Sequence, residues 1–124
     1  DVCSSDLEGD WTAESGYNAA LSLLDHYQFT ALVVGNDQMA LGAISALHDR
    51  GMRVPEDVSV VGFDDIPECA YFQPPLTTIR QNFSELGRLG LDYLVALIQR
   101  QGEGGQHVIT PELVVRGSTA PPQS

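Results

Sequence analysis

Basic residues are scarce in this sequence of 124 residues. Lysine and arginine together number 6, whereas aspartate and glutamate number 17, so the formal net charge at pH 7 is -11. A surface with this charge repels the phosphate backbone, on which affinity for nucleic acids mainly depends. We therefore do not expect this segment to bind DNA directly.

Cysteines are also few, and long apolar runs are absent. Cys3 and Cys69 show neither a CxxC spacing nor a zinc-ligand spacing, so we expect neither a metal site nor a disulfide. No apolar stretch is long enough to span a bilayer. With 43% hydrophobic residues, the chain suits one modest domain or a part of a larger one.

The first seven residues lack an initiator methionine and any periodic pattern. They resemble a peptide that arises when sequencing-adapter DNA is translated at the end of an assembled fragment. We therefore expect residues 1–7 to be a non-native tail and the natural protein to begin upstream. Coherent patterning begins at Glu8, and residues 121–124 are expected to form a second tail.

A buried strand that ends in two carboxylates is the strongest signal in the chain. The run from Val58 to Val61 is apolar on both faces except at Ser59, which predicts a central parallel strand covered by helices on both sides. Asp64 and Asp65 follow this strand at its carboxyl end, the edge where open α/β sheets bind ligands. This edge is the candidate binding site.

The order of strand, polar residue and helix occurs three times. Asn36 follows a β-prone segment at residues 31–34, and Gln81 follows another at residues 76–79. A βαβαβα order with right-handed crossovers would bring Asn36, Asp64 and Gln81 to one rim of a sheet. The remaining patterns predict helices at residues 13–27, 38–50 and 84–101, and strand pieces at residues 107–109 and 113–115.

Aromatic and apolar side chains suggest two further surfaces. Trp11 lies at the start of the first expected helix, where it can stack on a ligand, although a lone Trp more often only packs. The helix at residues 38–50 is apolar on more than one stripe, and the loop tip at Tyr71 and Phe72 has no evident core role. We therefore expect Leu41 and Phe72 to lie in a two-fold dimer interface.

Simpler explanations exist for several candidate residues. Asn36 could simply cap a helix, Asp65 could be a capping or supporting carboxylate, and Gln81 could be a surface polar group.

Paired carboxylates also serve phosphoryl transfer and glycoside hydrolysis, but neighbouring residues diverge as they leave a strand. No phosphate-binding glycine-rich loop or nucleophile elbow accompanies the pair. We therefore expect neither catalysis nor a cofactor at this edge.

Five ordered blocks of sequence resemble the lactose-repressor/galactose-repressor family of bacterial transcription regulators. They are EGDW at residues 8–11, NDQMALGAISAL at residues 36–47, GMRVPEDVSVVGFDD at residues 51–65, PPLTTIRQNFSELG at residues 74–87 and LVVRGST at residues 113–119. The resemblance covers residues 8–120. It implies the C-terminal portion of an effector-binding core with the α/β fold of type I periplasmic binding proteins, preceded in the intact protein by a helix-turn-helix head.

Roles for single residues follow from the same resemblance. At the matching positions of the family, Trp11 stacks on a sugar ring, Asn36 and Asp64 bind its hydroxyls, and Gln81 and Phe83 close the pocket. Planar polar groups beside an aromatic plane also suit the vicinal hydroxyls and apolar face of a sugar. The family implies a cytoplasmic homodimer that contacts operator DNA only through its absent N-terminal head. A periplasmic sugar-binding protein of a transport system is the alternative, and composition does not separate the two.

The resemblance also bears on the helix that is expected at residues 84–101. This helix belongs partly to a lobe whose strands lie outside the chain, so its apolar stripe is expected to lack a partner. The stripe consists of Leu86, Leu89, Tyr93, Leu94, Leu97 and Ile98.

Overall fold

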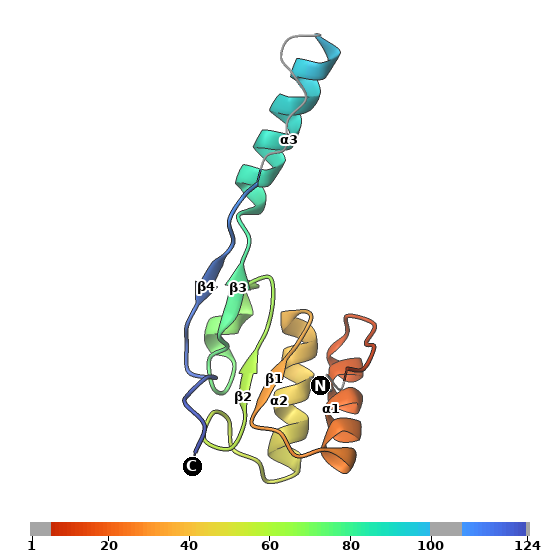
Figure 1. Cartoon of the computed structure of the whole chain (residues 1–124), viewed down its shortest axis with the longest axis vertical. Helices are drawn as coiled ribbons and strands as arrows, with labels where there is room; N and C mark the ends of the chain where they lie inside the picture. The colour runs from red at the N-terminus through yellow and green to blue at the C-terminus, as the bar shows by residue number, and fades with distance from the viewer. Residues whose placement is uncertain (1–5, 100–107, 124) are drawn as a thin grey trace, which may run out of the picture.

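The structure is a computed structural model that describes residues 6–99 and 108–123. Its elements are α1 (Ala13–His26), β1 (Ala31–Val33), α2 (Asp37–Asp49), β2 (Ser59–Val61), the short 3-10 helix η1 (Pro67–Tyr71), β3 (Thr78–Arg80), α3 (Phe83–Ile98) and β4 (Glu112–Val114) (Figure 1). The predicted helices and strands are confirmed to within a few residues, except that residues 108–110 are irregular. Residues 1–5 of the expected tail, and residues 100–107, lie outside the described part.

Parallel pairing organises the first part of the sheet. Strands β1 and β2 run parallel, with Ala31 opposite Ser59. The sheet continues past β2 through a parallel bridge between Val61 and Thr77, where the Gly62 N–H donates to the Thr77 carbonyl at 3.0 Å. The predicted parallel order is therefore confirmed up to β3. Strand β3 then pairs antiparallel with β4, a ribbon that the sequence pattern did not predict.

The segment after β4 returns to the sheet beside β2. The buried Ser118 hydroxyl donates to the Val60 carbonyl at 2.6 Å and accepts from the Thr77 N–H at 2.8 Å. The Val60 N–H in turn donates to the Ser118 carbonyl at 2.9 Å. Residues near the C-terminus thus satisfy backbone groups of β2 that would otherwise be buried without a partner.

Helices α1 and α2 lie side by side in close contact (Figure 1). A Cβ atom on Gly42 would overlap the carbonyl oxygen of Ala13, and one on Gly16 would overlap the carbonyl oxygen of Met39. Small residues at this crossing therefore let the two backbones touch. At its margin the Tyr17 hydroxyl donates to Asp49 Oδ2 at 2.6 Å.

Phe72 lies in the core, so the expectation that it belongs to an exposed apolar loop tip was wrong. Its side chain is 6% exposed and packs in a cluster with residues of α2, β2 and η1, whereas Tyr71 is 83% exposed. Residues three apart eclipse each other in a 3-10 helix, so Phe72 shares the inward side of η1 with the buried Cys69. Tyr71, the residue before Phe72, therefore points outward.

Helix α3 projects away from the rest of the described chain (Figure 1). None of its residues is fully buried, and most of the predicted apolar stripe is exposed, whereas Leu89 and Tyr93 are half-buried. Its exposed large apolar side chains are those of Phe83, Leu86, Leu91, Leu94, Val95, Leu97 and Ile98. Within residues 6–99 and 108–123, no helix is both long and apolar enough to cross a membrane.

Candidate functional site

Asn36 lies between β1 and α2 and connects the start of α2 to the segment before α1. Its side chain is nearly buried and caps α2, because Oδ1 accepts from the Met39 N–H at 2.9 Å. Its Nδ2 donates to the Trp11 carbonyl oxygen at 3.1 Å. The capping explanation therefore holds for Asn36. The amide retains one further lone pair and one further N–H.

Trp11 presents an exposed aromatic ring next to Asn36. Its backbone takes a φ of 72°, and its side chain is 66% exposed. A Cβ atom on Gly35 would lie 3.9 Å from Trp11 Cζ3, so the ring lies close to the residue that precedes Asn36. The structure thus brings Trp11 and Asn36 together, and the indole is free to stack on a ligand.

Asp64 carries a carboxylate to which no described residue donates a hydrogen bond. Its backbone is fixed by its N–H, which donates to the Ile79 carbonyl at 2.9 Å, and it takes a φ of 116°. Burial and the negative charge of Asp37 raise the pKa of this partly buried carboxyl. A half-buried carboxylate without a donor is a candidate for ligand binding.

Asp65 is occupied by two arginines, although it is the neighbour of Asp64. Its Oδ2 accepts from Arg80 Nε at 2.7 Å, and its Oδ1 accepts from Arg116 Nη2 at 2.8 Å. Burial by itself would raise the pKa of Asp65, but the hydrogen bonds and charges of Arg80 and Arg116 outweigh burial and lower it. The supporting role considered for Asp65 therefore fits the structure better than a role in binding.

Asp37 is the residue of this region that the sequence analysis missed. Its carboxylate is fully buried at the start of α2, where Oδ1 accepts from Thr78 Oγ1 at 2.7 Å and Oδ2 accepts from the Ile66 N–H at 2.8 Å. It thus connects the ends of β1 and β2 to β3. Its place directly after Asn36 at a helix start could not distinguish it from an ordinary acidic residue of the first turn.

Gln81 and Phe83 follow β3, and Gln81 comes directly after Arg80, which forms a parallel bridge with Asp64. Gln81 follows β3 and is partly exposed, and Phe83 is exposed at the first position of α3. Both line a hollow together with neighbouring residues of α3 and residues 109–112, and the lining of this hollow includes neither Trp11, Asn36 nor Asp64. Gln81 thus lies next to the strand edge that carries Asp64 and also lines this hollow with Phe83.

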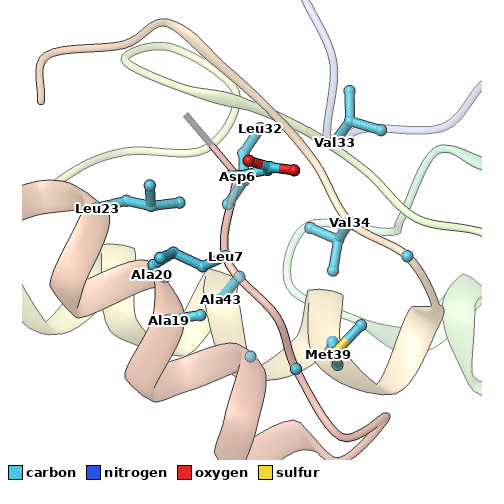
Figure 2. A pocket seen from close by; sticks show the side chains of 13 residues that line it. Asp6, Leu7, Ala19, Ala20, Leu23, Leu32, Val33, Val34, Met39 and Ala43 are labelled. Carbon is cyan, nitrogen blue, oxygen red and sulfur yellow. The ribbon is translucent and has the colours of Figure 1, made fainter. Parts of the chain in front are cut away.

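A separate apolar pocket lies between α1, β1 and residues 6–9. Figure 2 shows Leu7 beside Ala20 and Leu23, with Val34 and Met39 on the other side. Its lining is aliphatic apart from Asp6, so it lacks the hydrogen-bonding groups that a sugar requires. Asp6 and Leu7 also belong to the expected non-native tail. This pocket is therefore not the candidate site.

The sequence of this chain is similar to those of known proteins. The sequence model of the periplasmic binding protein-like domain matches residues 4–119. The lactose operon repressor of Escherichia coli (strain K12) is 42% identical over 121 residues, which cover 97% of this chain and 34% of the relative. A transcriptional repressor PurR of Haemophilus influenzae is 47% identical over 117 residues, which cover 90% of this chain and 35% of the relative.

Solved structures show the same relationship. The lac repressor dimer bound to operator and the anti-inducer ONPF superposes with a TM-score of 0.86 at 44% identity, over 90% of this chain and 40% of that chain. The chain therefore belongs to the periplasmic binding protein-like domain family, among the regulators of the lactose-repressor/galactose-repressor type. It spans about a third of the length of the curated relatives. These relatives are transcriptional repressors, not enzymes, as expected for this site.

Removal of the Asp65 carboxylate is expected to lower the stability of the full-length protein. Asp65→Asn leaves the partly buried Arg116 without its counter-ion and should cost about 2 kcal/mol in the free energy of unfolding. Because the pKa of Asp65 is lowered in the folded state, this contribution exists above the unfolded pKa and disappears as the pH falls through the folded value. Denaturant unfolding at neutral and acidic pH measures both effects.

The matched control for this prediction is Asp25→Asn. Asp25 pairs with Arg50 at 2.9 Å, but both side chains are exposed, so its loss should change the free energy of unfolding by less than about 0.5 kcal/mol. Equal effects of the two substitutions would contradict the role assigned to Asp65.

Proposed function

We propose that this chain is part of the effector-binding core of a bacterial transcription regulator that responds to a small sugar or sugar derivative. Trp11, Asn36 and Asp64 bind the effector, and Gln81 and Phe83 contact it from the start of α3. The observation that carries the proposal is the Asp64 carboxylate, which lies at the strand edge with no donor among the described residues. Sugar hydroxyls are such donors.

DNA binding is assigned to a helix-turn-helix domain outside this chain. The net charge of -11 disfavours direct contact between these residues and a phosphate backbone. The curated relatives are named as repressors, and one of them is an HTH-type repressor, so a regulator is favoured over the periplasmic transport protein. The effector therefore acts on DNA binding from a distance.

Replacement of Asp64 tests the proposed site. In the full-length protein, Asp64→Ala removes an acceptor of charge-assisted hydrogen bonds and should weaken effector binding by about 1.5 to 3 kcal/mol, or roughly 10- to 150-fold. A panel of neutral monosaccharides and disaccharides is screened by thermal shift against the wild type, and the hits are measured by calorimetry. Because the pKa of Asp64 is raised, binding should weaken as the pH falls toward that pKa.

Asp25→Ala is the control for this experiment, since Asp25 is an exposed aspartate on α1 whose only described partner is Arg50. It should leave effector affinity unchanged. No hit in the sugar panel would count against a sugar as effector, whereas a hit that binds Asp64→Ala as tightly as the wild type would remove Asp64 from the site.

The full-length protein is also proposed to be a homodimer. Leu41 is exposed on α2 and Tyr71 on η1, so these two side chains are available to a partner. Leu41→Ala combined with Tyr71→Ala should shift the protein toward monomer in sedimentation velocity. Phe72→Ala is unsuitable as a test, because it would leave a cavity in the core. A dimer that persists undiminished in the double variant would place the interface elsewhere.

A further inference from the structure

The Asp37 carboxylate lies between three segments that meet at the candidate site. It is fully buried at the first position of α2, next to Asn36. One oxygen accepts from Thr78 Oγ1 in β3 at 2.7 Å, and the other accepts from the Ile66 N–H at 2.8 Å. A buried charge that accepts two hydrogen bonds is strongly constrained in position.

The turn that carries Asp64 depends on this contact. Asp64 and Asp65 both take positive φ values, 116° and 61°, which are unfavourable for residues other than glycine. Such a backbone persists only where the surrounding structure imposes it. Asp37 contacts the turn on both sides of these residues, because it binds the Ile66 N–H and because a Cβ atom on Gly62 would overlap its Oδ1.

We propose that Asp37 is a positioning residue of the effector site, whose buried carboxylate fixes the Asp64 turn relative to Asn36 and strand β3. The inference rests on the proposed role of Asp64 in binding. Asp37 itself does not contact the effector, since it is buried beneath the turn. Asp37 determines where the Asp64 carboxylate lies, and its own negative charge acts on that carboxylate.

The charges around Asp64 support this assignment. On its own turn, Asp65 is neutralised by Arg80 of β3 and by Arg116, which follows β4. On η1, burial, a hydrogen bond with Asp37 and the charge of Asp37 raise the pKa of Cys69 to about 12, so its thiol is neutral. Asp37 is thus the described charge that, together with burial, raises the pKa of Asp64.

Two measurements on the full-length protein without ligand test the proposal. Carbon-detected NMR follows the titration of the Asp64 carboxyl, and amide hydrogen exchange follows the Ile66 N–H. In Asp37→Asn, the pKa of Asp64 should fall, and the Ile66 amide should exchange about tenfold faster than in the wild type. Asp49→Asn, which removes a charge from the far end of α2, should change neither quantity.

If Asp37 had only a structural role, Asp37→Asn would lower the melting temperature but leave the pKa of Asp64 unchanged. A folded Asp37→Asn variant with unchanged Asp64 titration and Ile66 exchange would overturn the proposal. If this variant does not fold, Thr78→Val, which removes one donor to the Asp37 carboxylate, is measured in its place, and unchanged Asp64 titration and Ile66 exchange in that variant would contradict the proposal. Both readouts are independent of effector binding, so a failure of the sugar panel leaves their result intact and affects only the proposed function.

Discussion

Produced on its own, the 124-residue chain is expected to bind a hydrophobic dye and to unfold without a sharp thermal transition. Helix α3 contains no fully buried residue, and four of its leucines (Leu86, Leu91, Leu94 and Leu97) and Ile98 are exposed. Each large apolar side chain left in water forfeits about 1.5 to 3 kcal/mol, and several together rival the roughly 5 to 15 kcal/mol by which whole domains are stable. The isolated chain should therefore be marginally stable and prone to aggregate.

Thermal denaturation and dye fluorescence of the isolated chain, compared with the full-length protein, measure this effect. The full-length protein should melt cooperatively and bind little dye, because its additional residues cover α3. A soluble monomeric fragment with a cooperative melt above about 60 °C, in the upper range of mesophilic domains, would show that α3 finds its partner within this chain.

The second large effect is expected at the crossing of α1 and α2. In Gly42→Ala, the new methyl group would overlap the carbonyl oxygen of Ala13, a backbone atom that moves only if the helices separate. Overpacking of this kind costs about 1 to 3 kcal/mol, and separation of the two helices would expose core side chains in addition. We therefore expect a loss of about 3 kcal/mol or more in the free energy of unfolding of the full-length protein.

Ser45→Ala is the control for Gly42→Ala. Ser45 is exposed on the same helix, so its replacement should change the free energy of unfolding by at most about 0.5 kcal/mol. Denaturant unfolding of both variants measures the difference. A Gly42→Ala variant as stable as Ser45→Ala would mean that α1 and α2 are not in backbone contact in solution.

Much of the fold could be predicted from the sequence, because local patterns report local structure. The apolar periodicity placed α1 and α2 within one residue of their observed bounds, and the apolar run at residues 58–61 correctly indicated strand β2. Only one face of this strand is buried, by Val58 and Val60, whereas Ser59 and Val61 are half-buried, so the expected burial on both faces was wrong. The side chain of Phe72 was misplaced because an apolar residue in a loop suits a core and an interface equally well. Only the 3-10 turn that precedes it decides between the two.

The candidate site was predicted less completely, because its support comes from distant residues. The sequence indicated Asp64 and Asp65 as a pair, but their separate environments depend on Arg116, which lies 51 residues from Asp65. The contact of Asp37 with Thr78 spans 41 residues in the same way. No local pattern encodes such contacts. The binding roles of Trp11, Asn36, Asp64, Gln81 and Phe83 remain predictions.

The contact between Ser118 and strand β2 has a consequence for the order in which the chain folds during synthesis. Ser118 supplies a donor and an acceptor to Val60, and its hydroxyl also accepts from the Thr77 N–H. On the ribosome, the helices and the β1–β2 pair emerge well before residue 118 does. Until then the far side of β2 presents open backbone groups to other chains, a state that favours misassembly. The segment around Ser118 therefore covers the open edge of β2 although it is not itself a strand.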